Sequence, residues 1–485
     1  MQRALPLRSL TLVAAAVLAG CVNLAPDYQA PALPVPQTLP SANVEAATPL
    51  DAGWRDFFVE PKLRAVIELA LANNRDLRVA ALNIERARAQ YGIARAGLFP
   101  TIDAGAGGSR SRTPGSLSTG GEPRYATQYS ADLGLTSYEI DLFGRVRNLS
   151  EAALQSFFQT EATQRGTQIS LVASVATAWL QLAADEQRLQ LARHTLESQR
   201  RSFDLIQRGH GLGAQSGLAL AQAQSTVDAA RADAAAFDSQ VEQDRNALAL
   251  LVGATPPAEL LPTPAATDPG TATATASAAT AEPAPAARLL VPPAGLPSSV
   301  LQQRPDVLAA EHALRASNAD IGAARAAFFP RIALTASAGT ASSTLSGLFA
   351  SGSSAWSFAP SISVPIFDGG ANRANLRVAE AQQKIQLASY EKTVQTAFRE
   401  VADALAERRT LAERLDAQRS LLDATSRSFS LSQSLFRSGA SSYLDVLDAQ
   451  RAYYAAQQTL IGLQLTEQTN RLTIYKVLGG GWKES

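Results

Sequence analysis

Residues able to do catalytic or metal chemistry are scattered in this chain of 485 residues. The three histidines (His194, His210 and His312) are far apart and Cys21 is the only cysteine, so neither a metal-ligand cluster nor a Cys/His nucleophile pair can be assembled. Carboxylates are abundant, but they fall on the polar faces of helical patterns. The 43 basic residues balance 43 acidic ones, which gives no sign of a nucleic-acid-binding patch. We expect no enzyme, no metal, no cofactor and no nucleic acid.

Cys21 is placed for covalent modification. It follows an apolar run, residues 10–19, and two arginines, Arg3 and Arg8, lie before that run. This is the layout of a secretory signal. The residues Leu-Ala-Gly before the cysteine resemble the bacterial lipobox, in which the thiol receives diacylglycerol, the signal is cut and the new amino terminus is acylated. We therefore expect a signal peptide over 1–20 and lipidation at Cys21; an ordinary secretory signal containing a cysteine is the alternative. No later segment approaches the ~20 apolar residues of a membrane-spanning helix.

The rest of the chain is an internal duplication. Residues 92–100 read GIARAGLFP and residues 322–330 read GAARAAFFP, a spacing of 230. A second series of matches, at a spacing of 226, runs from Arg201 with Arg427 to Gly253 with Gly479. Because so long a period is not that of a short solenoid repeat, we infer one architecture that is used twice.

Alternating large apolar and small polar residues mark the strands. After Trp356 the alternation covers about ten positions, as in a membrane β-barrel strand that turns its apolar face to lipid and its polar face to the lumen. We expect β-hairpins over 99–140 and 330–367. The predicted lipid-facing residues are Tyr129, Leu133, Leu135, Ile332, Leu334, Trp356, Phe358, Ile362 and Val364.

Four strands cannot form a barrel alone. Bacterial single-chain barrels have at least about 8 strands, and an open sheet edge does not occur in hydrocarbon, so the chain must oligomerise. Two copies would give about 8 strands and a filled interior, whereas three would give about 12 strands and room for a passage.

Long helices fill the remainder of each half. No proline lies between Gly144 and Pro256, and the glycines at 209–213 are the strongest break in that stretch. We expect a first long helix of about 65 residues, roughly 97 Å at 1.5 Å per residue, beside which a shorter returning helix and the helix before the hairpin stack end to end. The predicted helices are 62–97, 144–208, 215–252, 371–437 and 443–478.

Several short motifs stand out in this framework. They are WRDFF at 54–58, YEIDLFGRVR at 138–147, RPD at 304–306, AFFP at 327–330, PIFDGG at 365–370 and LGGGW at 478–482. Together they resemble the outer-membrane efflux ducts, the TolC-like family, and specifically its lipoprotein branch. The resemblance covers the chain from Cys21 to Trp482 apart from residues 262–287.

The resemblance implies a mixed α and β membrane protein. It would be a homotrimer in which four strands per chain contribute to a twelve-stranded β-barrel, and in which the long helices form a periplasmic α-helical tunnel. Such ducts work with a periplasmic adaptor (membrane fusion) protein and an inner-membrane pump of the RND type to expel small molecules such as drugs. The implied location is the cell outer membrane, with a lipid anchor at Cys21 and an extension into the periplasm.

The same resemblance gives roles to the two turns between helices. Leu444 and Asp448 lie on one helix face because they are four residues apart, and they match the family motif that closes the periplasmic end with an apolar and an acidic ring. The residues expected at this periplasmic gate are Leu444, Asp445 and Asp448. The alternative is that these acids are ordinary solvated surface residues. The residues expected at the tip that contacts the adaptor are Gly213, Ser216, Leu218, Gly439 and Ser442.

The predicted organisation follows from these assignments. Residues 262–287, which are rich in Pro, Ala and Thr, cannot bury enough apolar surface to order themselves, and we expect them to be a disordered insert in the linker. The predicted segments are the signal peptide 1–20, an anchored extension 21–60, the first repeat 61–253, an equatorial linker 254–298, the second repeat 299–479 and a tail 480–485.

Three other functions stay open at this stage. A protein-export duct of the type I secretion kind is the nearest, because the sequence of a duct does not encode its cargo. A lipid-anchored coiled-coil structural protein would leave the alternating strands without an explanation. A carboxylate-based periplasmic hydrolase would need an acidic pocket, for which the sequence offers no motif.

Overall fold

A computed structural model describes residues 22–40, 53–262, 286–288 and 297–480. The signal peptide, Cys21, most of the insert 262–287 and the last five residues lie outside this description. The chain divides into two compact units. The sheet unit comprises the described part of Met1–Ala32 with Leu82–Ala162 and Leu308–Lys392, and the helical unit comprises Leu33–Ala81, Thr163–Val307 and Thr393–Ser485.

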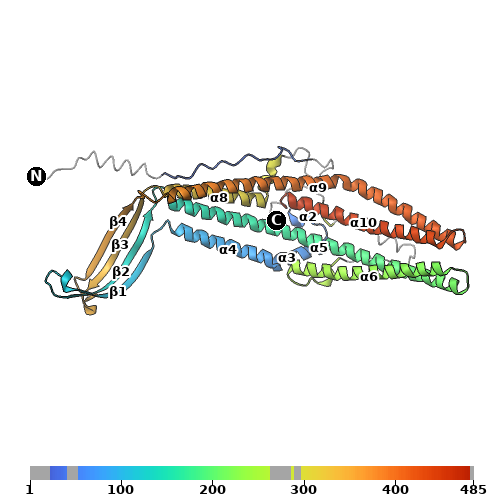
Figure 1. The fold of residues 1–485 in the computed structure, drawn as a ribbon, viewed down its shortest axis with the longest axis horizontal. Coiled ribbons are helices and arrows are strands. Elements are labelled where there is room, and N and C mark those ends of the chain that lie inside the picture. Colours follow the sequence, from blue (N-terminus) through green and yellow to red (C-terminus); the bar gives the residue numbers. More distant parts are fainter. Residues whose placement is uncertain (1–21, 41–52, 263–285, 289–296, 481–485) are drawn as a thin grey trace. The chain divides into compact units, whose positions relative to one another are not determined.

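The sheet unit contains four antiparallel strands, β1 (Ile102–Thr113), β2 (Arg124–Ile140), β3 (Arg331–Ser342) and β4 (Ser354–Ser363), in the order β1-β2-β3-β4 (Figure 1). Each repeat supplies one hairpin. The two hairpins join where β2 pairs with β3, with Leu133 opposite Ala338. As a result, β1 and β4 each have one edge with no neighbouring strand within the described chain.

β2 contains a β-bulge, which is one residue more than β3 has over the same stretch. The pairing shifts between Leu135 and Tyr138, and Ser137 between them has a φ of 50°, a left-handed value that is uncommon for a residue with a side chain. Such a bulge inserts one residue into one strand. It returns Tyr138 to the face of the sheet that carries Leu135, so the apolar alternation continues to the end of the strand.

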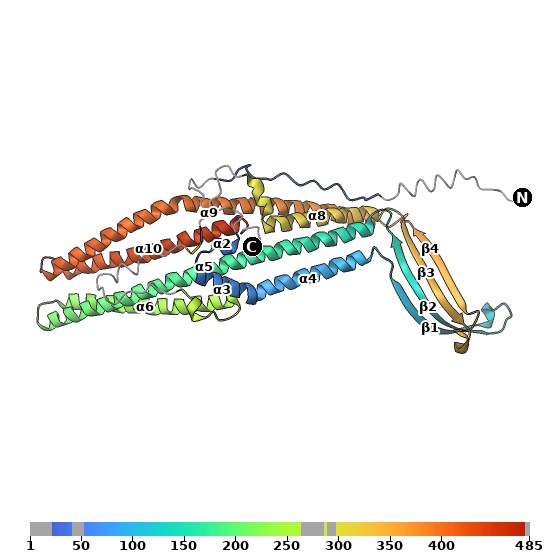
Figure 2. The ribbon, with the colours of Figure 1, turned by 180° about the vertical axis from the view of Figure 1, so that it is seen from behind.

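Long helices carry the duplication into the structure. The first long helix is α5 (Arg145–Gly211) and its counterpart is α9 (Ala371–Arg437); the returning helices are α6 (Gly217–Val252) and α10 (Tyr443–Val477). α9 begins 226 residues after α5 begins, and it ends 226 residues after α5 ends. This is the spacing of the second series of sequence matches. Figure 2 shows α6 beside α5 and α10 beside α9. The helix α8 (Pro305–Ala326) precedes the second hairpin, as α4 (Arg75–Ala96) precedes the first.

The helix expected over 62–97 is two helices, α3 (Pro61–Asn73) and α4. Asn74 interrupts them with an extended backbone; its side chain accepts a hydrogen bond from the Leu77 N–H at 2.8 Å and donates one to the Leu251 carbonyl at 2.8 Å. Asn is a preferred residue at a helix start for this reason. A β-carbon on Gly253 would lie 2.5 Å from the Asn73 carbonyl oxygen, so α6 ends against this junction.

Aromatic residues form the centre of the helical unit. Phe57, from the short helix α2 (Trp54–Phe57), stacks on Tyr475 of α10 with ring centroids 4.2 Å apart. Phe58 pairs with Ala287 of the linker through an isolated β-bridge. The aromatic pair of the WRDFF motif thus attaches the linker to α10.

A buried arginine explains the RPD motif. Arg304 donates hydrogen bonds to the Val477 carbonyl at 2.7 Å, to Glu400 at 2.8 Å and to both carboxylate oxygens of Asp306. Burial opposes the charge on Arg304, but the hydrogen bonds and charges of Asp306 and Glu400 outweigh it and raise the pKa of the guanidinium. The motif therefore joins the start of α8 to α9 and to the end of α10.

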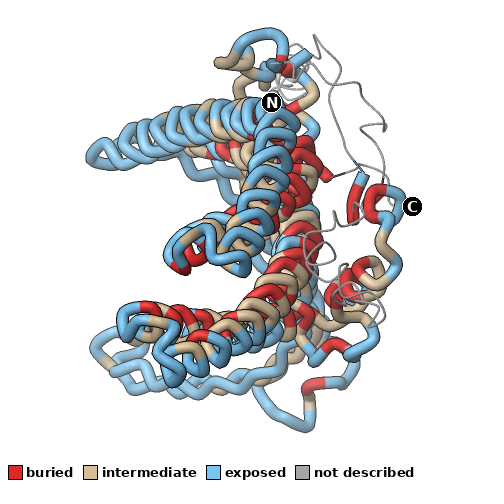
Figure 3. Tube along the Cα trace, turned by 90° about the vertical axis from the view of Figure 1, so that its right-hand side faces the viewer, coloured by how far each residue is buried: buried red, intermediate tan, exposed pale blue. Residues whose placement is uncertain are grey.

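Buried and exposed residues alternate along most helices (Figure 3). These helices therefore have one packed side and one solvated side. Among the described helices, α5 alone contains an 18-residue stretch apolar enough to cross a membrane by length and composition. Half of that stretch is buried within the chain, as expected for the core helix of a bundle.

Candidate functional site

The register of the sheet decides which residues share a face. Directly opposed residues in an antiparallel pair point to the same side, and the pairs Leu133–Ala104, Leu133–Ala338 and Trp356–Ala338 link all four strands. Following these pairs, one face carries eight of the nine residues expected to meet lipid: Tyr129, Leu133, Leu135, Ile332, Leu334, Trp356, Phe358 and Ile362. The ninth, Val364, lies just after the end of β4.

The opposite face of the sheet is small and polar. It carries Asp103 and Asp132 together with a row of serines, and the hydroxyls of Ser337 and Ser357 are 2.8 Å apart. At the end of β2, Glu139 accepts hydrogen bonds from Arg145 and forms an ion pair with Arg331 at 2.6 Å. A face without large apolar groups can border water.

The two turns between helices have the same backbone. Gly213 and Gly439 have φ values of 74° and 75°, in the left-handed region that favours glycine. In each turn the residue after this glycine donates its N–H at 2.8 Å to the carbonyl five residues earlier, which is the hydrogen bond of a Schellman end. A β-carbon on either glycine would meet no atom within 4 Å, so the outer side of each turn is open.

Serines begin both returning helices. Ser216 accepts a hydrogen bond from the Ala219 N–H at 3.1 Å. Ser442 does the same for Asp445, and the Asp445 carboxylate accepts the Ser442 N–H at 3.0 Å, so the two form a capping box. Capping by such residues stabilises a helix by about 1 kcal/mol. Asp445 therefore caps the start of α10, a role that was not predicted from the sequence.

Leu444 and Asp448 lie on the side of α10 that the chain leaves uncovered. The other side is occupied by Tyr443, Val446 and Leu447, which pack in a cluster with Ile206 of α5 and with Ala219 and Ala223 of α6. Leu444 is 45% exposed, and the exposed Asp448 has only a loose ion pair with Arg451 at 3.5 Å. The structure therefore places these two residues together, on a face available to another copy or another molecule.

The first repeat presents a similar but uncharged face. Leu218 is exposed like its counterpart Leu444, and Gln222 stands where the second repeat has Asp448. The difference in charge between the two turns is the main chemical asymmetry at these helix starts.

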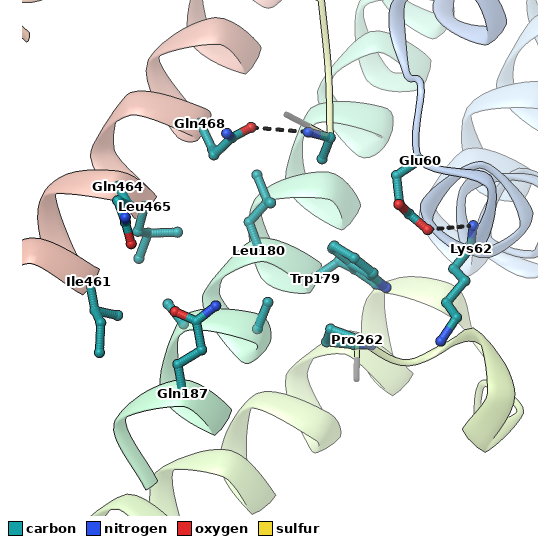
Figure 4. Close-up of a pocket in the computed structure, with 13 residues that line it drawn as sticks. Glu60, Lys62, Trp179, Leu180, Gln187, Pro262, Ile461, Gln464, Leu465 and Gln468 are labelled. Carbon is teal, nitrogen blue, oxygen red and sulfur yellow. Dashed lines mark hydrogen bonds between the residues drawn. The ribbon is translucent and has the colours of Figure 1, made fainter. Parts of the chain in front are cut away.

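A cavity of about 230 Å³ lies in the helical unit where the linker crosses the long helices. Figure 4 shows Trp179 and Leu180 of α5 on one side and Ile461 and Leu465 of α10 on another. Most polar groups around it are already paired: Trp179 donates to the Leu260 carbonyl at 3.0 Å, and Gln468 accepts the Ala286 N–H at 3.2 Å. No local sequence signal predicted it, because its lining comes from distant segments.

Within the described residues, no three His, Cys, Asp or Glu side chains are grouped so that they could hold a metal ion. The Nδ1 of His312 donates a hydrogen bond to Oε1 of Gln155 at 2.7 Å, and burial lowers the pKa of the imidazole. It is a satisfied packing residue against Phe158.

Comparison with known proteins agrees with this geometry. The family model described as outer membrane efflux protein matches residues 66–254 and 296–480. The antibiotic efflux pump outer membrane protein ArpC of Pseudomonas putida is 46% identical over 481 residues, covering 97% of this chain and 95% of that protein. The outer membrane protein OprJ of Pseudomonas aeruginosa is 43% identical over 474 residues, covering 97% of this chain and 95% of OprJ.

A solved structure extends the comparison to three dimensions. The MtrE outer membrane channel of Neisseria gonorrhoeae, captured in its open state, matches with a TM-score of 0.81 and 39% identity, covering 95% of this chain and 98% of that one. The predicted class of fold, mixed α and β with long helices and a four-stranded sheet in each chain, is confirmed by this likeness.

Proposed function

The chain belongs to the outer membrane efflux protein family, and we propose that three copies of it form a passive duct for small molecules. Its predicted function as an outer-membrane efflux channel, and its prediction as a protein without enzymatic activity, are confirmed by this membership. A purely structural coiled-coil protein and a hydrolase are both excluded by it. The number of copies, the partners, the gate and the lipid anchor are inferences from the residues described above.

The four-stranded sheet carries the proposal of a trimer. One face carries large apolar residues from β2, β3 and β4 together with Ile102 of β1, yet β1 and β4 each have one edge with no partner strand among the described residues. Hydrocarbon does not tolerate unpaired backbone groups, so in a membrane these edges must pair with other copies. Three copies provide twelve strands and a lumen wide enough for a passage, bordered by the small polar face.

The names of the relatives support the partners that we propose. ArpC is named as a component of an antibiotic efflux pump, and a passive channel in the outer membrane needs an energised pump elsewhere. We infer that this chain receives drugs or other toxic small molecules from an inner-membrane pump of the RND type through a periplasmic adaptor. The turns at Gly213 and Gly439 are the proposed contact with the adaptor, because both repeats keep the same open glycine, capping serine and exposed leucine there.

Gly213→Asn and Gly439→Asn test the contact with the adaptor. Asparagine tolerates the left-handed backbone better than other residues with a side chain, and there is open space at both sites, so the trimer should form normally. The added side chains should weaken adaptor binding severalfold in a surface-binding assay with the purified adaptor. Gly121→Asn is the matched control, since Gly121 in the β1–β2 loop has a φ of 75° and the same open surroundings. Parent-like adaptor binding by both tip variants would refute this placement.

The proposed gate consists of Leu444 and Asp448 from each copy. Both project from the face of α10 that the packed cluster leaves free, and they lie one helical turn apart. Around a threefold axis, three leucines would form an apolar constriction and three aspartates an acidic one. Carboxylates brought together in this way repel one another and attract cations.

Replacing Leu444 and Asp448 together by alanine should widen the resting pore. Single-channel conductance in planar bilayers is then expected to rise severalfold and to depend less on divalent cations. The matched control is Leu218→Ala with Gln222→Ala, the equivalent pair in the first repeat, which should change conductance little. Asp445→Asn is a second control, because it removes a charge while keeping an acceptor for the Ser442 N–H. If the double variant at 444 and 448 conducts like the parent, the constriction lies elsewhere.

The proposed lipid anchor at Cys21 is supported by the residues that follow it. Asn23 accepts a hydrogen bond from Asn148 at 2.8 Å, and the Pro26 carbonyl accepts one from Asn318 at 2.7 Å. Gly322 provides the room for this extension, since a β-carbon there would lie 2.8 Å from Ala25. Residues 23–26 are therefore fixed to α5 and α8, within the unit that contains the four strands.

Mass spectrometry of the amino-terminal peptide should show a triacylated Cys21. Cys21→Ala, combined with a signal that is cleaved without lipidation, should lose this mass yet still assemble in the outer membrane, because the strands carry their own apolar face. A parent protein with a free thiol at Cys21 would contradict the anchor.

A further inference from the structure

Two buried carboxylates face each other between α5 and α6. Asp185 of α5 is 2% exposed and Asp244 of α6 is 8% exposed. The two helices meet at these residues, because Glu186, next to Asp185, pairs with Arg245, next to Asp244, at 3.2 Å. Asp185 accepts hydrogen bonds from Gln181 at 2.6 Å and from Arg188 at 2.7 Å. Asp244 accepts one from Gln240 at 3.0 Å through Oδ1, whereas its Oδ2 has no partner in the described chain. Two acceptors therefore meet with no donor between them.

The charges around this pair do not balance when both acids are ionised. Arg188 supplies one positive charge, which is held by Asp185. The neighbouring Glu186 is paired with Arg245 at 3.2 Å. From α10, Lys476 borders the same groove as Asp244 but forms no ion pair with it in the described structure. A buried, uncompensated carboxylate is strongly unfavourable, and one proton would remove the excess charge and supply the missing donor.

The duplication provides a natural comparison. The residue 226 positions after Asp244 is Asn470, and both are followed by arginine. Asn470 is buried on α10, where its Nδ2 donates hydrogen bonds at 3.0 Å to the Ala404 carbonyl and at 3.0 Å to Glu407, both on α9. Leu411 takes the position of Asp185. The second pair of helices thus has a permanent amide donor where the first has an acid that can donate only when protonated.

We propose that Asp185 and Asp244 share a single proton and form a pH-sensitive latch between α5 and α6. With the proton present, Asp244 donates to Asp185 as Asn470 donates across α9 and α10. When the proton is lost, two carboxylates repel each other inside the interface and the contact between the helices loosens. The adjoining α9–α10 interface keeps its amide donor at every pH, so the device is confined to the first repeat.

The raised pKa of Asp244 decides how the stability of the contact between α5 and α6 changes with pH. Burial raises its pKa to about 6; Gln240 opposes this, and the adjacent Asp185 adds to it. In an unfolded chain an aspartate titrates near 3.9. Because the pKa is higher in the folded state, the stabilisation by the proton is complete below about pH 4 and is lost as the pH rises through about 6. An acidic periplasm would therefore tighten the α5–α6 pair.

Hydrogen exchange of the intact protein in lipid nanodiscs, measured from pH 4.5 to 7.5 and corrected for intrinsic exchange rates, tests the latch. Amides around Asp185 and Asp244 should lose roughly twentyfold in protection across this range, because the pKa of about 6 in the folded state and the unfolded value of about 3.9 differ by about two units. The corresponding amides around Leu411 and Asn470 in the same sample should change little. Asp244→Asn and Asp185→Asn should each flatten the response, because either variant leaves one carboxylate facing one amide donor.

A control and a direct readout make the outcome decisive. Asp238→Asn, which removes an acid at an exposed site on α6, should leave the response in place. Infrared difference spectra should show the carbonyl stretch of a protonated carboxylic acid at pH 5, and this band should vanish in Asp244→Asn. The proposal is overturned if Asp244→Asn keeps the pH response of the parent, or if the parent shows no such band.

Discussion

Unpaired backbone groups at the edges of the sheet impose the assembly of this protein. Each chain brings four strands that share a face with large apolar residues on β2, β3 and β4, and the strand pairings inside the chain satisfy the N–H and carbonyl groups that they join. The outer edges of β1 and β4 have no such partner among the residues that the structure describes. In water an open edge can be tolerated, but in hydrocarbon each unsatisfied group costs several kcal/mol. The membrane location shown by the family therefore requires neighbouring copies.

Duplication explains how one chain meets the other demands of a duct. Each repeat contributes a hairpin, a long helix and a returning helix, and the shared offset of 226 residues keeps equivalent positions comparable. The repeats then diverge at the two places where we propose a gate and a pH-sensitive latch. Gln222 corresponds to Asp448 at the helix starts, and Asp244 corresponds to Asn470 between the long helices. In both cases one repeat has an acid and the other has an amide. The two repeats therefore differ in side-chain charge at these positions, although both positions lie on equivalent helices.

Much of this could be predicted from the sequence, because the signals were local and periodic. Alternation after Trp356 and the absence of proline after Gly144 depend on neighbouring residues alone, and they indicated strands and long helices where the structure has them. The break at Asn74 could not be predicted from its neighbours, because it depends on contact with the end of α6. The same holds for the pairing of Arg304 with Glu400 and for the meeting of Asp185 and Asp244, which distant segments bring together. The capping role of Asp445 had a local signal, serine followed three residues later by an acid.

Native mass spectrometry of the complex released gently from the outer membrane tests the central claim most directly. If closure of the sheet edges governs assembly, the only stable species should contain three chains, and disrupting the β1 edge with proline at a hydrogen-bonded position should abolish it. A stable monomer, or a complex of two chains that still conducts in bilayers, would contradict the account.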